Sequence, residues 1–463
     1  MANTYLSRSI SGGNQKTFTL SVWVKRSEIG SNVYGTILSY ADSVGGGGGT
    51  PRGEIILYED KLQFGMNPTG NSWSTFNTGT RRFRDTSAWY HIVVAVDTTQ
   101  GTASNRLKMY VNGELQTLSS APDTQNFNTG FNKNSSTNHI GRSTSGTGNF
   151  FSGCMAHYHF VDGSALAATV FGSVDSVTGE WQINTSPSFT PGTNGFTILK
   201  DGNTITDQSS NSNNWSSNGA GVTTTKDCPS NNFPTFIAAG HTGSYKFYNG
   251  ATTSFGDGTN DWSKATIGTL GASDGKYYWE IKLGMNGGAT DYNITGVARS
   301  DKTFSNGTLY SNGGWNAIQS SNAAGNIGIY SQTNASMGGA LYIGGSSVNL
   351  TNGDIVMYAL DLDNKKMWVG KNGTWANAGS GGGVGNPATG ANPLWGTGEF
   401  TTGATYLPGN IQYQTSDCSY NFGNGYFKTT AVASAGTNAS GNGIFEYNVP
   451  SGFTALSTKG LNL

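Results

Sequence analysis

The clearest feature of the sequence is a series of short segments in which apolar and polar residues alternate. In the segment TFTLSVWVK (17–25), Phe18, Leu20, Val22 and Val24 alternate with Thr19 and other mostly polar residues. A period of two residues is typical of a β-strand that buries one face. The pattern therefore predicts a strand here, and similar segments follow along the chain.

The first half of the chain predicts a set of short strands joined by tight turns. Trp89–Val96 is its most apolar segment and should be a central strand. One hairpin is expected in EIILYEDKLQFG, which turns at Glu59 and Asp60, and another in RLKMYVNGELQ, which turns at Asn112-Gly113. The Asn-Gly dipeptide accepts the positive φ of a type I′ turn. The other predicted strands are 36–40, 54–58, 61–65, 138–142 and 151–161.

The alternation weakens between about residues 167 and 240 and then resumes. Residues 210–233 are polar and rich in turn formers, which favours a surface connector with a short strand at 195–200 and strands added to either neighbour. In the second half, the hairpin KMWVGKNGTW again turns on an Asn-Gly pair, at 372–373. Strands are predicted at 276–283, 292–298, 354–361 and 411–422.

The two halves share one scheme, a buried strand, a polar turn and a hairpin with Asn-Gly at its tip. It occurs in WYHIVVAVD…RLKMYVNGEL and again in GDIVMYALDLDNKKMWVGKNGTW. The fold class predicted from this repetition is all-β, with two tandem β-sandwiches of jelly-roll type. The expected divisions are a first sandwich at 1–170, a polar connector at 171–240, a second sandwich at 241–430 and a closing segment at 431–463.

The composition narrows the class of protein. The 463 residues include 69 Gly, 12% aromatic and only 11% charged residues, with a net charge of −1. High aromatic and low charged content argues against disorder, and the scarcity of helix formers argues against a helical protein. The absence of a basic cluster argues against a nucleic-acid partner, and the absence of a long apolar run argues against membrane insertion.

The N-terminal residues and the cysteines indicate where the protein is made. Residues 1–15 lack the apolar stretch of a secretory signal peptide. The three cysteines, Cys154, Cys228 and Cys418, are scattered and match neither a disulfide framework nor a metal-binding spacing. We therefore expect synthesis in a reducing cytoplasm.

Several segments match known modules. In the first half these are YLSRSISGGNQKTFTLSVWVKRS, WYHIVVAVDTT, NRLKMYVNGEL and FFSGCMAHYHFVDGSAL. With them, residues 1–170 resemble the laminin-G/concanavalin A-like jelly rolls of marine phage proteins. Through GKYYWEIKL, ITGVARSD, DIVMYALDLDNKKMWVGKNGTW and YNFG, residues of about 241–425 resemble a SPRY domain. The resemblance implies a phage virion structural protein of the fibre or decoration type.

Catalytic motifs are weak. Glucanases of the concanavalin A-like fold place acidic residues at i, i+2 and i+4 of one strand, and no Glu triplet here has that spacing. Asp361 and Asp363 are spaced by two but precede a hairpin, so we interpret them as turn carboxylates. Gly271–Gly275 matches GxSxG, but a strand follows it where the nucleophile elbow needs a helix. We expect no enzyme, with a polysaccharide-degrading enzyme of this fold as an alternative.

Metal binding has two weak candidate sites. His157 and His159 alternate on one strand, so both could reach one ion, with His139 as a third ligand if the fold brings it near. Laminin-G-like domains often carry Ca²⁺, and the resemblance places such a site at Asp97 and the Asn105 region. We expect no cofactor, with Ca²⁺ left open.

Aromatic residues in Gly/Asn-rich stretches are the candidate ligand-binding residues. Rings stack on the CH faces of sugars while neighbouring amides bond their hydroxyls. The candidates are Trp262, Tyr292, Trp315 and Trp395, of which Trp315 and Trp395 should be the better exposed. The one basic run, Arg81-Arg82-Phe83-Arg84, should form local salt bridges or an inter-subunit contact.

These observations predict a non-enzymatic virion protein, such as a tail fibre, knob or capsid decoration, that attaches to host-surface glycans or proteins. Its partners would be other virion proteins and further copies of itself, with a trimer expected for a fibre. It would be made in the host cytoplasm and reach the particle without an export signal. A purely structural protein that cements capsid or tail parts is an alternative.

Overall fold

The computed structural model divides into two compact units, Met1–Thr224 and Thr225–Leu463. Within the part of the chain that the structure describes, no helix has the length and apolar character needed to cross a membrane. The described residues are 4–42, 50–70, 73–144, 148–200, 204–219, 221–238, 246–256, 258, 265–285, 292–301, 320–321, 327–332, 341–378 and 381–462.

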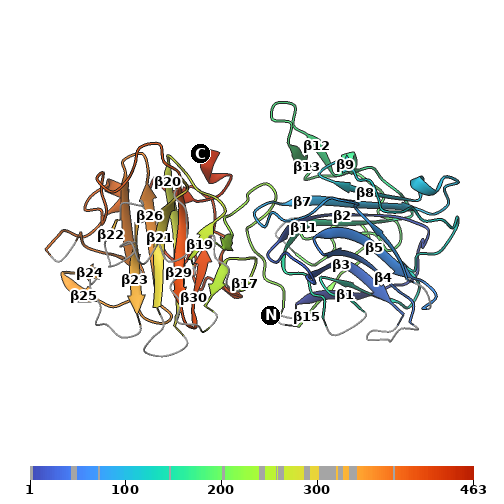
Figure 1. Cartoon of the computed structure of the whole chain (residues 1–463), viewed down its shortest axis with the longest axis horizontal. Helices are drawn as coiled ribbons and strands as arrows, with labels where there is room; N and C mark the ends of the chain where they lie inside the picture. The colour runs from blue at the N-terminus through green and yellow to red at the C-terminus, as the bar shows by residue number, and fades with distance from the viewer. Residues whose placement is uncertain are drawn as a thin grey trace. The chain divides into compact units, whose positions relative to one another are not determined.

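The first unit is a sandwich of two sheets, which Figure 1 shows as separate layers. The seven-stranded sheet runs from edge to edge as β15 (Ser216–Asn218), β1 (Tyr5–Ser9), β10 (Thr137–Ile140), β3 (Tyr34–Ala41), β4 (Arg52–Tyr58), β5 (Lys61–Asn67) and β6 (Ser74–Asn77). The six-stranded sheet runs as β14 (Phe196–Ile198), β11 (Gly153–Asp162), β2 (Thr17–Arg26), β7 (Tyr90–Asp97), β8 (Leu107–Val111) and β9 (Glu114–Leu115). The short helix η1 (Ala103–Asn105) precedes β8.

The alternating residues of the first half form the core between these sheets. In β2, the side chains of Phe18, Leu20, Val22 and Val24 are fully buried in one cluster with inward residues of the opposite sheet. The all-β, tandem-sandwich prediction is therefore confirmed. Burial of alternate positions also sets the strand register, because a shift by one residue would turn the apolar set outward.

Both predicted hairpins of the first unit have turns with positive φ. Asn112 and Gly113 have φ values of 49° and 79°, and Glu59 and Asp60 have 49° and 60°. Positive φ at both central residues is the signature of a type I′ turn, whose twist matches that of the flanking strands. The Asn-Gly prediction is confirmed, whereas the conformation of the Glu-Asp turn was not expected from its residue types.

The expected separate connector at 171–240 is wrong in its boundaries. Residues up to 224 belong to the first unit, where β14 pairs with β11 and β15 pairs with β1, as the added strands had suggested. Residues 163–195, which we call the strap, pack on the outer face of the six-stranded sheet. The strap contains η2 (Ala168–Val170) and the paired strands β12 (Gly172–Val174) and β13 (Trp181–Ile183).

The strap explains why polar residues of β2 are buried. Ser21 and Trp23 point away from the main core but are 0% and 5% exposed, because the strap covers them. Trp181 donates its indole N–H to His91 Nδ1 at 2.9 Å, and Ser21 Oγ lies 2.9 Å from His91 Nε2. Alternation therefore marked the inner face correctly but did not show that the outer face is covered as well.

The second unit also has two main sheets, and their shared core contains Trp279, Tyr358 and Trp368. The six-stranded sheet runs as β16 (Phe236–Ala238), β19 (Ala265–Gly268), β29 (Tyr406–Tyr413), β21 (Tyr292–Arg299), β23 (Ile327–Gln332) and β22 (Ser320–Ser321). The eight-stranded sheet runs as β17 (Lys246–Tyr248), β18 (Thr253–Phe255), β30 (Ser416–Asn421), β20 (Lys276–Met285), β26 (Ile355–Asp361), β27 (Lys366–Lys371) and β28 (Thr374–Trp375), and β33 (Thr454–Ala455) pairs with β20.

Smaller elements complete the second unit. Asn372 and Gly373 have φ values of 46° and 88°, which confirms the third predicted hairpin turn. The two-stranded sheets are β24 (Leu341–Ile343) with β25 (Ser346–Val348) and β31 (Tyr426–Phe427) with β32 (Thr430–Ala431). The short helices are η4 (Pro387–Thr389) and η5 (Gly460–Asn462).

The segment 431–463 is an integral part of the second unit rather than a closing appendage. Phe445, Val449, Phe453 and Leu456 are buried in its core. The backbone N–H groups of residues 446 and 447 both bond the carboxylate of Glu280, which is fully buried in β20. Residues 445–456 therefore contribute both apolar side chains and hydrogen bonds to the core of the second unit.

Candidate functional site

An exposed tryptophan lies on the outer face of the seven-stranded sheet. Trp73 directly precedes β6 and is 44% exposed. Its ring folds back over β5 at Gly65, so that a Cβ at Gly65 would stand 2.8 Å from Cζ2 of the indole. Because Gly65 has no side chain, the ring can lie against the backbone of the sheet as a platform.

Polar side chains surround this ring on the same face. The Arg52 guanidinium stacks on the indole, 5.5 Å from the ring centroid. Arg52 pairs in register with Asn67, so both side chains stand on the outer face. Arg52 Nε and Asn67 Oδ1 have no hydrogen-bond partner among the described residues. Gln63 and Asn77, paired in the next outward row, add two amides. We call Arg52, Gln63, Asn67, Trp73 and Asn77 the Trp73 face.

One carboxylate, Glu54, lies beside this face without a second one opposite it. Glu54 pairs with Ser39 on β3 and with Gly65 on β5, and Arg52 and Ile56 flank it on its own strand face. The Ser143 hydroxyl donates a hydrogen bond to its carboxylate. Glycoside hydrolysis by a retaining enzyme needs two carboxyl groups about 5–5.5 Å apart. The two cross-strand partners of Glu54, Ser39 and Gly65, are not acidic.

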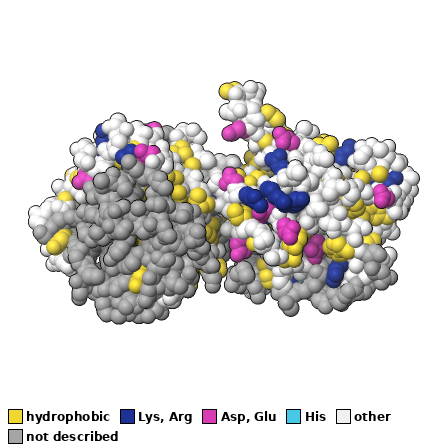
Figure 2. All heavy atoms as spheres, viewed as in Figure 1, with side chains coloured by type: hydrophobic (Ala, Val, Ile, Leu, Met, Phe, Trp, Pro, Cys, Tyr) yellow, Lys and Arg dark blue, Asp and Glu magenta, His cyan; other side chains and the backbone are white. Residues whose placement is uncertain are grey.

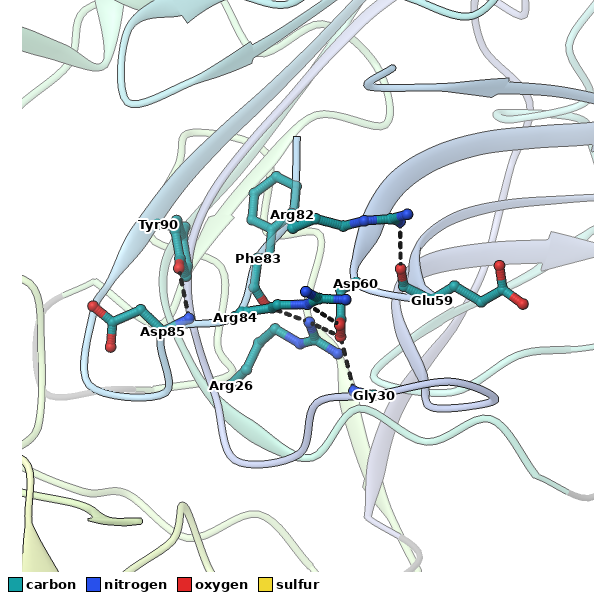
Figure 3. Close-up of polar contacts among 9 residues, drawn as sticks. All are labelled: Arg26, Gly30, Glu59, Asp60, Arg82, Phe83, Arg84, Asp85 and Tyr90. Atoms are coloured by element: carbon teal, nitrogen blue, oxygen red, sulfur yellow. Dashed lines mark hydrogen bonds and ion pairs between the residues drawn. The ribbon is translucent and has the colours of Figure 1, made fainter. Parts of the chain in front are cut away.

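The basic run forms local contacts, as predicted, and Figure 3 shows them at the turn between β4 and β5. The Arg84 and Arg26 side chains bond the two oxygens of Asp60 at 2.9 and 3.0 Å, and Arg82 donates to the backbone oxygen of Glu59. Burial alone would raise the pKa of Asp60, but hydrogen bonds from Gly30, Arg84 and Arg26 outweigh it and hold the pKa below its ordinary value.

Charges elsewhere on the first unit are also interspersed. Figure 2 shows basic and acidic side chains close together on the face in view. Arg81 likewise pairs with Glu114 at 3.3 Å. The described surface seen there has no extended basic patch of the kind that binds nucleic acid.

Of the four predicted aromatic ligand residues, only Trp395 has a side chain within the described part of the chain. Trp395 is only 2% exposed and belongs to the core of the second unit, so the expectation that it is exposed is wrong. Its backbone pairs with Met367 of β27, which places the Gly/Pro-rich stretch against the sheet. Tyr292 begins β21, and its side chain lies outside the described part. Trp262 and Trp315 also lie outside the described residues.

The histidines are buried and do not converge on one site. A bulge separates Ala156 from His159 in the pairing with β2, and His157 has a φ of 47°. Thus His157 and His159 do not follow simple strand alternation, and their ring centroids lie 6.4 Å apart. His139 lies in the other sheet, where its ring meets that of Tyr5 edge-on, so it is not a third ligand. In the described residues, no group of three His, Cys, Asp or Glu could hold a metal ion.

Burial controls the protonation of these rings. It lowers the pKa of His159 to about 3, with the charges of His157, His91 and Lys200 acting in the same direction. His159 Nδ1 lies 3.0 Å from Thr197 Oγ1. The ring is therefore a neutral hydrogen-bonding group at neutral pH.

The Asp97 carboxylate already has hydrogen-bond donors around it, and all of them are neutral groups. Its carboxylate accepts hydrogen bonds from the side chains of Thr17, Thr99 and Gln100. Partial burial would raise its pKa, but these bonds outweigh burial and hold the pKa below its ordinary value. A Ca²⁺ ion here would have to displace these donors.

The weak catalytic motifs have turn geometry. Asp361 accepts a hydrogen bond from the backbone of Asn364, three residues further on, as turn carboxylates do. Asp363, in the same turn, accepts one from the backbone of Gly275, just before β20. Ser273 donates to the adjacent Asp274, and the strand β20 follows at once. The Asp361/Asp363 pair and the Gly271–Gly275 motif therefore both lie at turns, as predicted.

One comparison with known proteins matches most of the first unit. Residues 3–171 match the family model of the concanavalin A-like lectin/glucanases superfamily. That match covers the Trp73 face and most of both sheets of the first unit. No curated protein matches the chain.

Solved structures give more distant likenesses. One is domain 4 of an extracellular arabinanase from Geobacillus stearothermophilus, in complex with arabinotriose, at 16% identity over 34% of this chain and 65% of that chain, with a TM-score of 0.26. Another is the SPRY domain of human HERC1, at 11% identity over 36% and 86%, with a TM-score of 0.23. A third is a sialidase CBM40 from Ruminococcus gnavus, at 13% identity over 36% and 94%, with a TM-score of 0.27. These scores are too low to carry an argument, so the SPRY resemblance of the second unit stays a prediction.

Sequence reasoning missed Trp73. It stands in TGNSWSTFN (69–77), as rich in Gly, Asn and Ser as the stretches that were singled out. The distinguishing feature is Gly65 beneath the ring, which is contributed by the neighbouring strand.

Proposed function

We propose that this chain is a non-enzymatic structural protein of a phage particle that binds host-surface glycans through the Trp73 face. The observation that carries the glycan part is the exposed indole of Trp73 over Gly65, with the amides of Gln63 and Asn77 on the same face of the sheet; Asn67, also on this face, is 4% exposed. The similarity of residues 3–171 to a superfamily of lectins and glucanases supports the same substrate class.

The chemistry of the Trp73 face suits a neutral sugar. The indole would stack on the CH face of a pyranose ring, and the amides would bond its hydroxyls as donors and acceptors. Arg52 adds guanidinium donors while its plane keeps the indole in place. We expect binding without cleavage rather than a polysaccharide-degrading enzyme, because the cross-strand partners of Glu54, Ser39 and Gly65, are not acidic, whereas retaining hydrolysis needs two carboxyl groups.

The virion part of the proposal rests on the sequence resemblance and the composition. A surface poor in charge and rich in Asn, Ser, Thr and Gly suits recognition through neutral polar groups. The expected partners are other virion proteins and further copies of this chain. Cryo-electron microscopy of intact particles tests this part directly, since the two sandwiches should be found on the head or tail surface.

A glycan array with the full-length chain tests the Trp73 face. Trp73→Ala should weaken binding about tenfold or more, because loss of a stacked ring costs about 1.4 kcal/mol. Gly65→Ala should also weaken binding, because its Cβ would displace the ring while the strand backbone tolerates alanine. Leu115→Ala, which removes an exposed apolar side chain from the six-stranded sheet, is the matched control and should change nothing.

Three results would contradict this function. Equal binding by the wild type and Trp73→Ala would move the glycan site elsewhere. Absence of any glycan signal would favour the purely structural cementing role. Release of reducing ends from a bound polysaccharide would favour the enzyme.

A further inference from the structure

A second polar pocket lies on the opposite side of the first unit, between the strap and the edge of the six-stranded sheet. It has a volume of about 290 Å³. Its walls come from β11, β14, the strap and the loop after β14, and its lining residues are His159, Ser186, Pro187, Phe189, Pro191, Thr197, Lys200, Gln208, Ser209 and Ser210. Most of these residues lie beyond residue 171, where the family match ends.

The loop that closes the pocket is fixed by a buried carboxylate. Asp207 is 9% exposed and accepts hydrogen bonds from the backbone of Thr197, Ser209 and Asn213 at 2.7–2.9 Å, and from the Ser209 hydroxyl at 2.8 Å. The Asn211 amide ties the same loop to the backbone oxygens of residues 192 and 195. The pocket is therefore held open by its own scaffold, and a ligand would not have to order the loop.

The lining combines one aromatic edge and two prolines with hydroxyl and amide groups, and it includes one ammonium group, that of Lys200. The ring of Phe189 packs against Phe171 and stands edge-on to His159, with centroids 5.5 and 5.6 Å away. The hydroxyls of Ser186 and Ser210 can each donate and accept, as a sugar hydroxyl does. His159 at the floor is neutral, so it can also serve either role.

The size of the pocket limits the ligand. Pockets for drug-sized ligands begin at roughly 300 Å³, so this one takes a single ring rather than an extended chain. A small polyol with one apolar face matches both the volume and the lining. An apolar ligand would leave these polar groups without partners.

We infer that this pocket is a binding site for a single neutral sugar residue, separate from the Trp73 face. The inference does not depend on glycan binding at Trp73, because the two sites lie on different sheets.

Saturation-transfer NMR with the full-length chain tests this inference. The probes are glucose, galactose, mannose and N-acetylglucosamine, with sulfate as an anionic competitor. At least one sugar should bind with a Kd on the order of 1 mM, as expected for about a dozen ligand atoms. Sulfate should not displace it.

Variants test whether the sugar binds in this pocket. Ser210→Phe fills the pocket from an exposed position and should weaken binding at least about tenfold, and Gln208→Ala should weaken it about fivefold through loss of one hydrogen bond. Trp73→Ala should leave monosaccharide binding intact, which separates this site from the proposed function. Ser216→Phe makes the same change at an exposed position of β15 and is the control.

The inference is overturned by any of three outcomes: no sugar binds, binding survives both Ser210→Phe and Gln208→Ala, or sulfate displaces the sugar. The last result would identify the pocket as an anion site centred on Lys200.

Discussion

The buried carboxylate of Glu280 should make the stability of the second unit fall as pH rises. Its two oxygens accept hydrogen bonds from the Tyr447 and Glu446 backbones at 2.8 Å, from the Tyr278 hydroxyl at 2.9 Å and from Asn421 at 3.2 Å. Burial raises its pKa from 4.5 to about 7, although these hydrogen bonds act in the opposite direction. The native state therefore holds this proton more tightly than the unfolded chain does.

The sign and size of the effect follow from that difference. Between pH 4.5 and pH 7 the native state binds more protons than the unfolded state, so stability decreases with rising pH and levels off above the folded pKa. One pKa unit is worth about 1.4 kcal/mol, so Glu280 alone should remove about 2 to 3 kcal/mol between pH 5 and pH 8.

The variant Glu280→Gln should abolish this dependence, because an amide does not titrate. Its amide nitrogen cannot accept hydrogen bonds, so two of the four donors lose their acceptor and the variant should be less stable at pH 5. Relative to the wild type, however, it should gain about 2 to 3 kcal/mol as the pH is raised from 5 to 8.

Hydrogen exchange with mass spectrometry on the full-length chain measures this in the second unit itself, through peptides from β20 and from residues 445–456. Asp274→Asn makes a similar charge change at an exposed position of the same unit and is the control. A stability difference between Glu280→Gln and the wild type that stays constant from pH 5 to pH 8 would refute the reasoning.

Two further predictions concern charge and thiol chemistry. Asp60→Ala leaves the 2%-exposed Arg26 side chain without its ion pair and should cost about 3–5 kcal/mol of unfolding free energy, whereas Arg84→Ala, at a 65%-exposed side chain, should cost less than about 1 kcal/mol. Urea denaturation measures both unfolding free energies. Equal losses would contradict the claim that the buried Arg26–Asp60 pair matters more than the exposed Arg84–Asp60 pair. Burial raises the pKa of the Cys418 thiol, so a charged thiol reagent at pH 8 should label Cys228 in the native chain but not Cys418, as mapped by mass spectrometry. Native labelling of Cys418 would show that its strand opens.

Local patterns were sufficient for most strands and for the Asn-Gly turns. The single strand predicted at 411–422 is wrong, because a turn at residues 414–415 divides this stretch between β29 and β30. The alternation in β2 required one buried face, and Asn112-Gly113 tolerates the positive φ that a type I′ turn imposes. Both properties belong to the residues themselves and to their immediate neighbours, so they could be derived without knowing the fold.

The exposure of aromatic residues could not be derived in that way. Trp395 and Trp73 both stand among Gly, Asn and Ser or Pro, yet one is 2% and the other 44% exposed. The difference lies in what packs on each ring: Trp395 pairs with β27 inside the second unit, and Trp73 rests on Gly65 of a neighbouring strand.

By itself the sequence determined the all-β class, the two sandwiches and the scarcity of charge, because these depend on composition and on a period of two residues. The tertiary structure alone decided that the polar stretch after residue 162 becomes the strap of the first unit, and that Gly65 lies under Trp73. It also decided that the Glu280 carboxylate in β20 accepts hydrogen bonds from the backbone of residues 446 and 447. These are contacts between residues far apart in sequence, and their energy depends on what the fold brings together rather than on any local pattern.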